Sequence, residues 1–137
     1  MMKTLFSMTL ALILTLGAGP GLARADGLRD HKQINDGLTN IAIADMIRKK
    51  CPTISARMIT AYGYMRSLKR IANNEGYSDK EIEAFVTNKQ EKARVEGAAR
   101  AWLQSQGVTL SRPDSYCVAG RTEIDRNSQI GVLLRSK

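Results

Sequence analysis

Apolar residues recur at three- and four-residue steps through almost the whole chain from Ile34 onward, and this spacing limits the fold more than any other feature. Residues three and four apart share one face of an α-helix, whereas a half-buried strand needs strict alternation of apolar and polar residues. No alternating stretch is long enough to predict a sheet. We therefore expect an all-α protein.

The first predicted helix runs from about Ile34 to Lys50. Asn35 or Asp36 can cap its start, because their short side chains accept hydrogen bonds from free backbone N–H groups. Basic residues near its end suit the helix dipole, and Pro52 stops it.

The second predicted helix has the clearest apolar stripe. Thr53 is the expected N-cap, and Gly76 is suited to the left-handed conformation that ends a helix. Gly63 inside this helix is explained by a close helix crossing or, alternatively, by a functional kink. The stripe consists of Ile54, Met58, Ala61, Met65, Leu68 and Ala72.

The third predicted helix opens with a capping box formed by Ser78 and Glu81. Its central stretch, Thr87 to Lys92, is polar almost all round, so we expect it to be exposed or to mark a bend. The fourth helix begins near Pro113, which is favoured in a first helical turn. Four helices with short connections predict an irregular antiparallel four-helix bundle.

The N-terminus predicts export from the cytoplasm. Lys3 precedes an apolar run from Leu5 to Leu16, and Ala23 and Ala25 match the small-residue cleavage pattern of a signal peptide. The run is too short to span a bilayer, and no second run follows. We expect cleavage after Ala25 and a periplasmic mature chain without a transmembrane segment; a retained N-terminal anchor is the alternative.

Removal of residues 1–25 leaves a chain of one domain. Of 137 residues 112 remain, and the loss of Lys3 and Arg24 leaves 19 basic and 13 acidic residues, a formal charge of +6. Residues 26–33 are polar and contain Gly27, so we expect a flexible N-terminal arm. Residues 34–137 are expected to form a single helical domain.

Cys51 and Cys117 are the two cysteines of the chain. An even pair in a small exported domain indicates a disulfide bond, and nothing in the sequence supports the alternatives of a metal site or a reactive thiol. Closing a loop of about 66 residues stabilises a fold by about 4 kcal/mol in the chain-entropy model. The bond would join the end of the first helix to the fourth.

Few residues are suited to catalysis or to holding a metal. His31 is the single histidine, and with two cysteines it cannot complete an ordinary zinc site. The sequence contains no C-x-x-C, phosphate-binding glycine or haem-attachment motif. Acidic residues at the start of the third helix are better explained by the helix dipole than as a catalytic carboxylate pair. We expect no catalytic residue, no metal and no cofactor.

Two candidate partner surfaces follow from the sequence. A basic patch on the second helix suits an acidic protein or an anionic lipid, although a solvated, mixed-charge face explains it as well. The apolar C-terminal segment either docks on its own core or enters a partner's groove. Nucleic acid is excluded as a partner because export separates the protein from it. The residues of the two surfaces are Arg57, Arg66, Lys69, Arg70, Ile130, Leu133 and Leu134.

Several segments resemble one known family. They include Ile43–Arg48 followed by Cys51, then Gly76–Ile82, Tyr116–Cys117 and Ser128–Gly131, and the two cysteines with their flanking residues are the most specific part. They are similar to a small exported family of unknown function from alphaproteobacteria, domain of unknown function 5333, over most of the mature chain. The resemblance implies a periplasmic protein of a Gram-negative bacterium, and it implies no activity and no binding residues.

The sequence as a whole predicts a non-catalytic periplasmic interaction or accessory protein whose partner is another envelope protein. The alternative is a small-molecule or lipid-binding protein, or a hydrolase of envelope material. Each alternative requires an apolar pocket between helices with converging polar groups.

Overall fold

The computed structural model describes residues 23–137, so residues 1–22 of the expected leader lie outside the described part of the chain. Cleavage after Ala25 stays a prediction. The elements are α1 (Ala23–Asp30), α2 (Lys32–Lys50), β1 (Ile54–Ala56), α3 (Met58–Asn74), α4 (Asp79–Thr87), α5 (Lys89–Ser105), α6 (Pro113–Asp125), the 3₁₀ helix η1 (Gly131–Leu133) and β2 (Leu134–Ser136).

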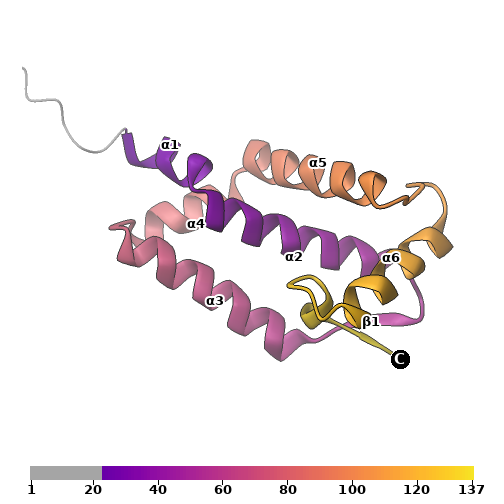
Figure 1. Ribbon diagram of the computed structural model, residues 1–137. Coiled ribbons are helices and arrows are strands. Elements are labelled where there is room, and N and C mark those ends of the chain that lie inside the picture. The colour runs from indigo at the N-terminus through magenta and orange to yellow at the C-terminus, as the bar shows by residue number, and fades with distance from the viewer. Residues whose placement is uncertain (1–22) are drawn as a thin grey trace, which may run out of the picture.

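The helices α3, α2 and α5 lie side by side, with α2 in the middle (Figure 1). At one end of α2 the chain packs α6, η1 and the two strands, while α4 joins α3 to α5 near the other end. The expectation of a mostly helical fold with one disulfide is confirmed. The four-helix bundle is not, because the described residues form six α-helices and a small sheet.

The two short strands are a departure from the all-α expectation. Strands β1 and β2 pair antiparallel, with Ile54 opposite Ser136 and Ala56 opposite Leu134. Each strand has three residues, which is too short for alternation to appear in a sequence pattern. Ile54 therefore belongs to a strand, and Arg57, not Thr53, is the N-cap of α3.

The segment 26–33, expected to be a flexible arm, lies in α1 and the start of α2. Leu28 is only 1% exposed and packs into a cluster with Ile34, Ala72 and Phe85, which we call the N-terminal cluster. The N-cap of α2 is His31, whose Nδ1 accepts a hydrogen bond from the Ile34 N–H at 3.4 Å. Burial of Leu28 is the physical reason that this segment is held.

A sharp corner separates α4 from α5, in the polar stretch where the sequence offered a bend as one of two alternatives. The capping box at the start of α4 is confirmed: Glu81 N–H donates to Ser78 Oγ at 3.1 Å, and Ser78 N–H donates to Glu81 Oε2 at 2.7 Å. Asn88 ends α4 and caps α5, since its Oδ1 accepts from the N–H groups of Gln90 and Glu91.

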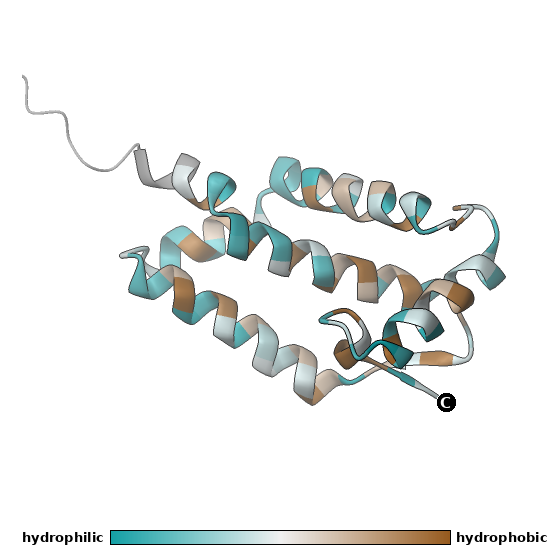
Figure 2. Ribbon diagram, viewed as in Figure 1, coloured by the Kyte–Doolittle hydropathy of each residue, from teal (hydrophilic) through white to brown (hydrophobic). Residues whose placement is uncertain are grey.

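The predicted disulfide between Cys51 and Cys117 is present, with Cα atoms 5.1 Å apart. Cys51 is fully buried, and the larger of two apolar clusters surrounds the bond; we call it the disulfide cluster. Figure 2 shows hydrophobic residues gathered where the C-terminal half of α2 meets α6 and β1. The other members of this cluster are Ile43, Ala44, Ile47, Ile54, Ala99, Leu103, Val108, Tyr116, Ala119, Ile130, Leu133 and Leu134.

The close helix crossing lies at a different glycine from the one expected. Nothing lies within 4 Å of where a Cβ on Gly63 would be, so that residue faces open space. A Cβ on Gly37 of α2 would lie 2.5 Å from Leu68 Cδ2 of α3, so Gly37 lets these two helices approach. No helix within residues 23–137 is long and apolar enough to cross a membrane.

Candidate functional site

An open apolar groove of about 650 Å³ lies over α2, between α3 and α5. Its floor is α2, its walls are α3 and α5, and residues of α4 close one end while β1 and η1 close the other. The lining residues are Leu38, Ile41, Ala42, Ala44, Asp45, Met46, Arg48, Lys49, Ala56, Met58, Ala61, Met65, Phe85, Val86, Glu91, Lys92, Val95, Glu96 and Leu133.

The groove floor is one face of α2. Leu38, Ala42, Asp45 and Lys49 are spaced by four, three and four residues, so they share this face. Ile47, which packs against α6 near Gly120, points to another side of the same helix. The apolar floor residues are only partly buried, because the described chain packs no further helix over them.

The α3 wall is the half of the predicted apolar stripe that the protein leaves uncovered. Leu68 and Ala72, in the C-terminal half of α3, are 6% and 2% exposed. Met58 and Met65, in the N-terminal half, are 56% and 41% exposed and line the groove together with Ala61. Unbranched methionine side chains adapt to irregular surfaces, which suits a wall that contacts another molecule.

Charged residues stand at one end of the groove, in the last turns of α2. The two carboxylate oxygens of Asp45 pair with Arg48 at 2.5 Å and with Lys49 at 2.6 Å. Two cations thus surround one anion, which leaves this end of the groove positive.

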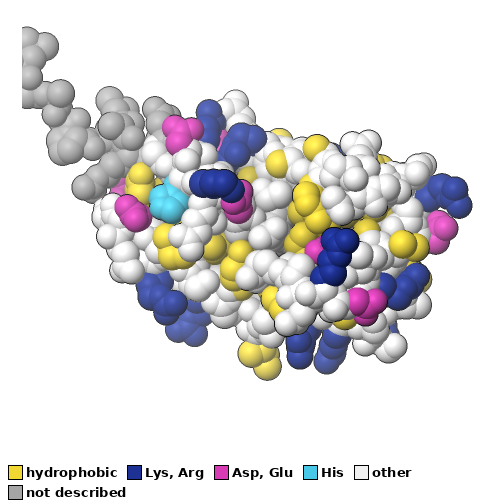
Figure 3. Space-filling model, in the orientation of Figure 1, with side chains coloured by type: hydrophobic (Ala, Val, Ile, Leu, Met, Phe, Trp, Pro, Cys, Tyr) yellow, Lys and Arg dark blue, Asp and Glu magenta, His cyan; other side chains and the backbone are white. Residues whose placement is uncertain are grey.

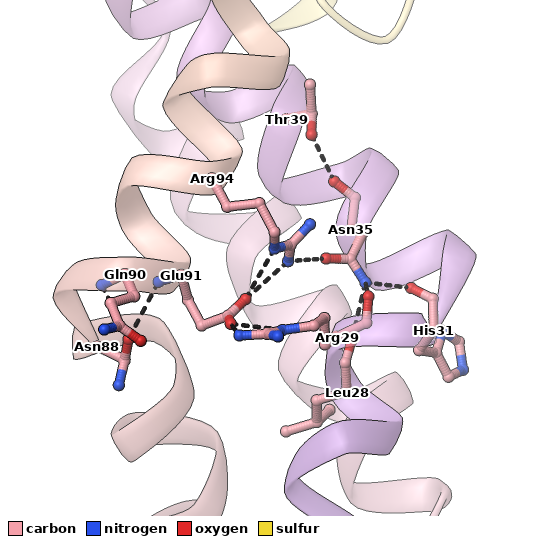
Figure 4. Close-up of polar contacts among 9 residues, drawn as sticks. All are labelled: Leu28, Arg29, His31, Asn35, Thr39, Asn88, Gln90, Glu91 and Arg94. Carbon is pink, nitrogen blue, oxygen red and sulfur yellow. Dashed lines mark hydrogen bonds and ion pairs between the residues drawn. The ribbon is translucent and has the colours of Figure 1, made fainter.

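The α5 wall carries a buried carboxylate, that of Glu91, which is 6% exposed (Figure 4). Arg29 of α1 donates to Glu91 Oε1 from Nε at 2.6 Å and also from its terminal nitrogen. Arg94 donates to Oε2 from Nε at 2.9 Å, and it donates to Asn35 Oδ1 of α2 at 2.6 Å. The Glu91 carboxylate therefore links α1 to α5, and Arg94 extends the network to α2.

The pKa of the Glu91 carboxyl is lowered from its ordinary value of 4.5. The largest cause is the hydrogen bonding from Arg29; burial acts in the opposite direction, and Arg94 lowers the pKa further. Glu91 also pairs with Arg94 at 2.9 Å. Of the two alternatives for the stretch 87–92, the bend is observed at Asn88, and Glu91 within the stretch is buried. Its partner Arg29, 62 residues away, could not be found from local spacing.

The basic candidate residues lie on the surface. Arg57, Arg66, Lys69 and Arg70 are exposed at the start of α3 or along it, and Figure 3 shows Lys and Arg side chains along the α3 edge of the molecule. Lys69 pairs with Asp79 at 3.2 Å. The remaining three form no ion pair with another described residue, so the α3 edge is positive.

The apolar C-terminal segment, the second candidate partner surface, packs into the core of the protein. Ile130, Leu133 and Leu134 are 5%, 2% and 2% exposed and belong to the disulfide cluster. Strand pairing with β1 holds the segment down, and the Arg57 N–H donates to the Leu133 carbonyl at 2.8 Å. The segment therefore docks on its own core, and only Leu133 reaches an end of the groove.

The single histidine, His31, has a structural role at the start of α2. His31 caps α2, and its Nε2 lies 3.9 Å from Glu75 Oε1. Within residues 23–137, no three His, Cys, Asp or Glu side chains are grouped to hold a metal ion. The groove could not be found from the sequence, because a stripe of apolar residues predicts burial and does not show that a covering element is lacking.

A family model described as Family of unknown function (DUF5333) matches residues 26–135. No curated protein and no solved structure is significantly similar to the chain.

Proposed function

The chain belongs to the DUF5333 family of unknown function, and we propose that it is a non-catalytic periplasmic interaction protein that holds an apolar surface of an envelope protein in the groove between α2, α3 and α5. The groove is the observation that carries the proposal. A folded chain of this size normally covers its own apolar stripes, so an uncovered one marks a binding surface.

The periplasmic part of the proposal is supported by the leader pattern and by the disulfide. Disulfides persist in oxidising compartments and are rare in the cytosol. The family match starts at Asp26, the residue that follows the expected cleavage after Ala25. Cell fractionation and N-terminal sequencing of native material test this part; a cytoplasmic protein that retains Met1 would contradict it.

The groove itself is tested by photo-crosslinking in cells. A photoreactive residue at Val95, on the α5 wall, should give a crosslinked companion in stoichiometric yield from the periplasmic fraction. The matched control is Val118 of α6, an equally apolar residue that is 60% exposed and does not line the groove. Absence of a companion at Val95, or equal yield at the two positions, would contradict the proposal.

A second candidate is a small-molecule or lipid-binding protein. It is favoured by the volume of the groove, about 650 Å³, which lies within the range of small-ligand pockets, about 300–1,000 Å³. Native mass spectrometry of the protein purified from its own periplasm tests it. A ligand mass that disappears in Val95→Glu, on the groove wall, and persists in Val118→Glu is the expected result, and an empty protein would reject this candidate.

A further inference from the structure

We propose that the occupant of the groove is an amphipathic α-helix of about three turns whose polar face is acidic. This inference rests on the proposed function and names the kind of surface that the partner presents. Its support comes from the length, the openness and the charge of the groove.

The length of the groove matches a short helix. The floor runs along α2 from Leu38 to Lys49, which at 1.5 Å per residue is about 17 Å, or about three helical turns. The lining residues of α3, Met58, Ala61 and Met65, also follow helical spacing. Ridges of side chains with this spacing are what a further helix packs against.

The openness of the groove favours a helix over an acyl chain. Met58 and Met65 of the α3 wall are 56% and 41% exposed, so the groove is open to solvent on this side and an occupant would keep part of its surface in water. An acyl chain has no polar side to place there, and small ligands are usually enclosed over most of their surface. An amphipathic helix buries one face and keeps the other solvated.

The charge around the groove favours an acidic polar face. At the end of the floor, Arg48 and Lys49 outnumber Asp45. At the α5 wall, the lining carboxylate of Glu91 pairs with two arginines, Arg29 of α1 and Arg94 of α5, which themselves lie outside the lining. Both walls also have free cations beside them.

Lys92 of the α5 wall and Arg66, next to Met65 on α3, form no ion pair with another described residue. The residues that line the groove carry three cations and three carboxylates, so the excess of positive charge comes from Arg29, Arg94 and Arg66, which lie outside the lining. Acidic side chains on an occupant would meet these cations from both sides, which favours association at low ionic strength.

Two synthetic peptides test the inference. Both are amphipathic helices of about 18 residues with the same leucine–alanine face, and they carry glutamate or lysine on the polar face. Fluorescence anisotropy of labelled peptide with the purified protein should show the glutamate peptide binding at least about tenfold more tightly, and salt should reduce the difference. Equal affinity, or tighter binding of the lysine peptide, would overturn the acidic assignment.

A pair of variants on one helix locates the binding. Met65→Glu places a negative charge in the groove and should weaken binding of the glutamate peptide by about tenfold or more. Ile59→Glu is the control, since Ile59 is 91% exposed on α3 and does not line the groove; its affinity should stay within about twofold of the parent. Val95→Glu, on the opposite wall, repeats the test independently of α3.

The failures of the two proposals can be told apart. Palmitate that binds in the groove while neither peptide binds would overturn the helical occupant and support the lipid-binding candidate. Peptide affinity unchanged by both Met65→Glu and Val95→Glu would overturn the groove as the site. A companion crosslinked at Val95 in cells, together with no binding of either peptide, would overturn this inference and leave the proposed function standing.

Discussion

The two apolar clusters of this protein are stabilised in different ways. The disulfide cluster is large, and its covalent bond joins the end of α2 to α6. The N-terminal cluster has four buried residues, and the ionic network around Glu91 lies beside it. Its four residues come one each from α1, α2, α3 and α4 and enclose little apolar surface, so the hydrogen bonds from two arginines to Glu91 add to what holds this end together. The groove extends between these two differently held ends.

Removal of the disulfide bond should cause the largest loss of stability. Replacing both cysteines, Cys51→Ala with Cys117→Ala, should lower the free energy of unfolding by about 4 kcal/mol, because the loop closed by the bond is long. Urea unfolding followed by circular dichroism measures the loss. The parent protein treated with a reductant is the control and should behave alike. A loss below about 1 kcal/mol would show that packing alone holds this end.

The N-terminal cluster should depend on a residue close to the expected mature N-terminus. Leu28→Ala removes a side chain that is 1% exposed and should lower stability by about 3 kcal/mol. Ile59→Ala is the matched control, because Ile59 is 91% exposed and its truncation should change stability by less than about 0.5 kcal/mol. Equal unfolding midpoints for the two variants would show that Leu28 does not hold the N-terminal segment on the protein.

The ionic network should contribute less than Leu28. Glu91→Gln keeps the shape of the side chain and removes the charge that Arg29 and Arg94 surround, so stability at neutral pH should fall by about 2 kcal/mol. Chemical unfolding at neutral pH measures the change. Glu83→Gln, at an exposed glutamate of α4, should have almost no effect; an equal loss there would indicate a general charge effect.

The Glu91 contribution should also depend on pH in a definite direction. Because the folded state lowers the pKa of Glu91, the unfolded chain binds this proton more readily, and acid favours unfolding. The stabilisation is therefore present above pH 4.5 and is lost as the pH falls through the folded-state pKa. The difference in stability between parent and Glu91→Gln should shrink over that range, and a difference constant with pH would contradict the assignment.

Truncation of a side chain in the groove between the two clusters should change stability least. Met65→Ala truncates a side chain that is 41% exposed, so stability should change by less than about 1 kcal/mol. Binding of the glutamate peptide should weaken in the same variant, because the wall loses contact area. A large loss of stability with unchanged binding would mean that Met65 belongs to the core and does not serve an occupant.

Much of the helical architecture could be predicted because its signals are local. The capping box at Ser78, proline at the start of α6 and glycine after α3 each act within one helical turn. The pairing of Cys51 with Cys117 followed from an even cysteine count in a small exported chain. These features need no knowledge of what packs against them.

The rest depends on distant parts of the chain. Strand β1 exists because residues 80 positions later pair with it, and Glu91 is buried because Arg29 reaches it from α1. The apolar stripe of α3 was predicted correctly from Met58 onward, yet spacing cannot tell that Leu68 is covered and Met65 is not. The groove exists because no element of the described chain covers these apolar residues, and the lack of a covering element leaves no pattern in the sequence.

The change of direction between α4 and α5 depends on the side chain and backbone of one residue, Asn88. It accepts the first hydrogen bonds of α5 while its own backbone ends α4 in an extended conformation. In a descendant with a strong helix former at this position, residues 79–105 would join as a single rod of about 40 Å. Phe85 and Val86, which line one end of the groove, would then move away from it.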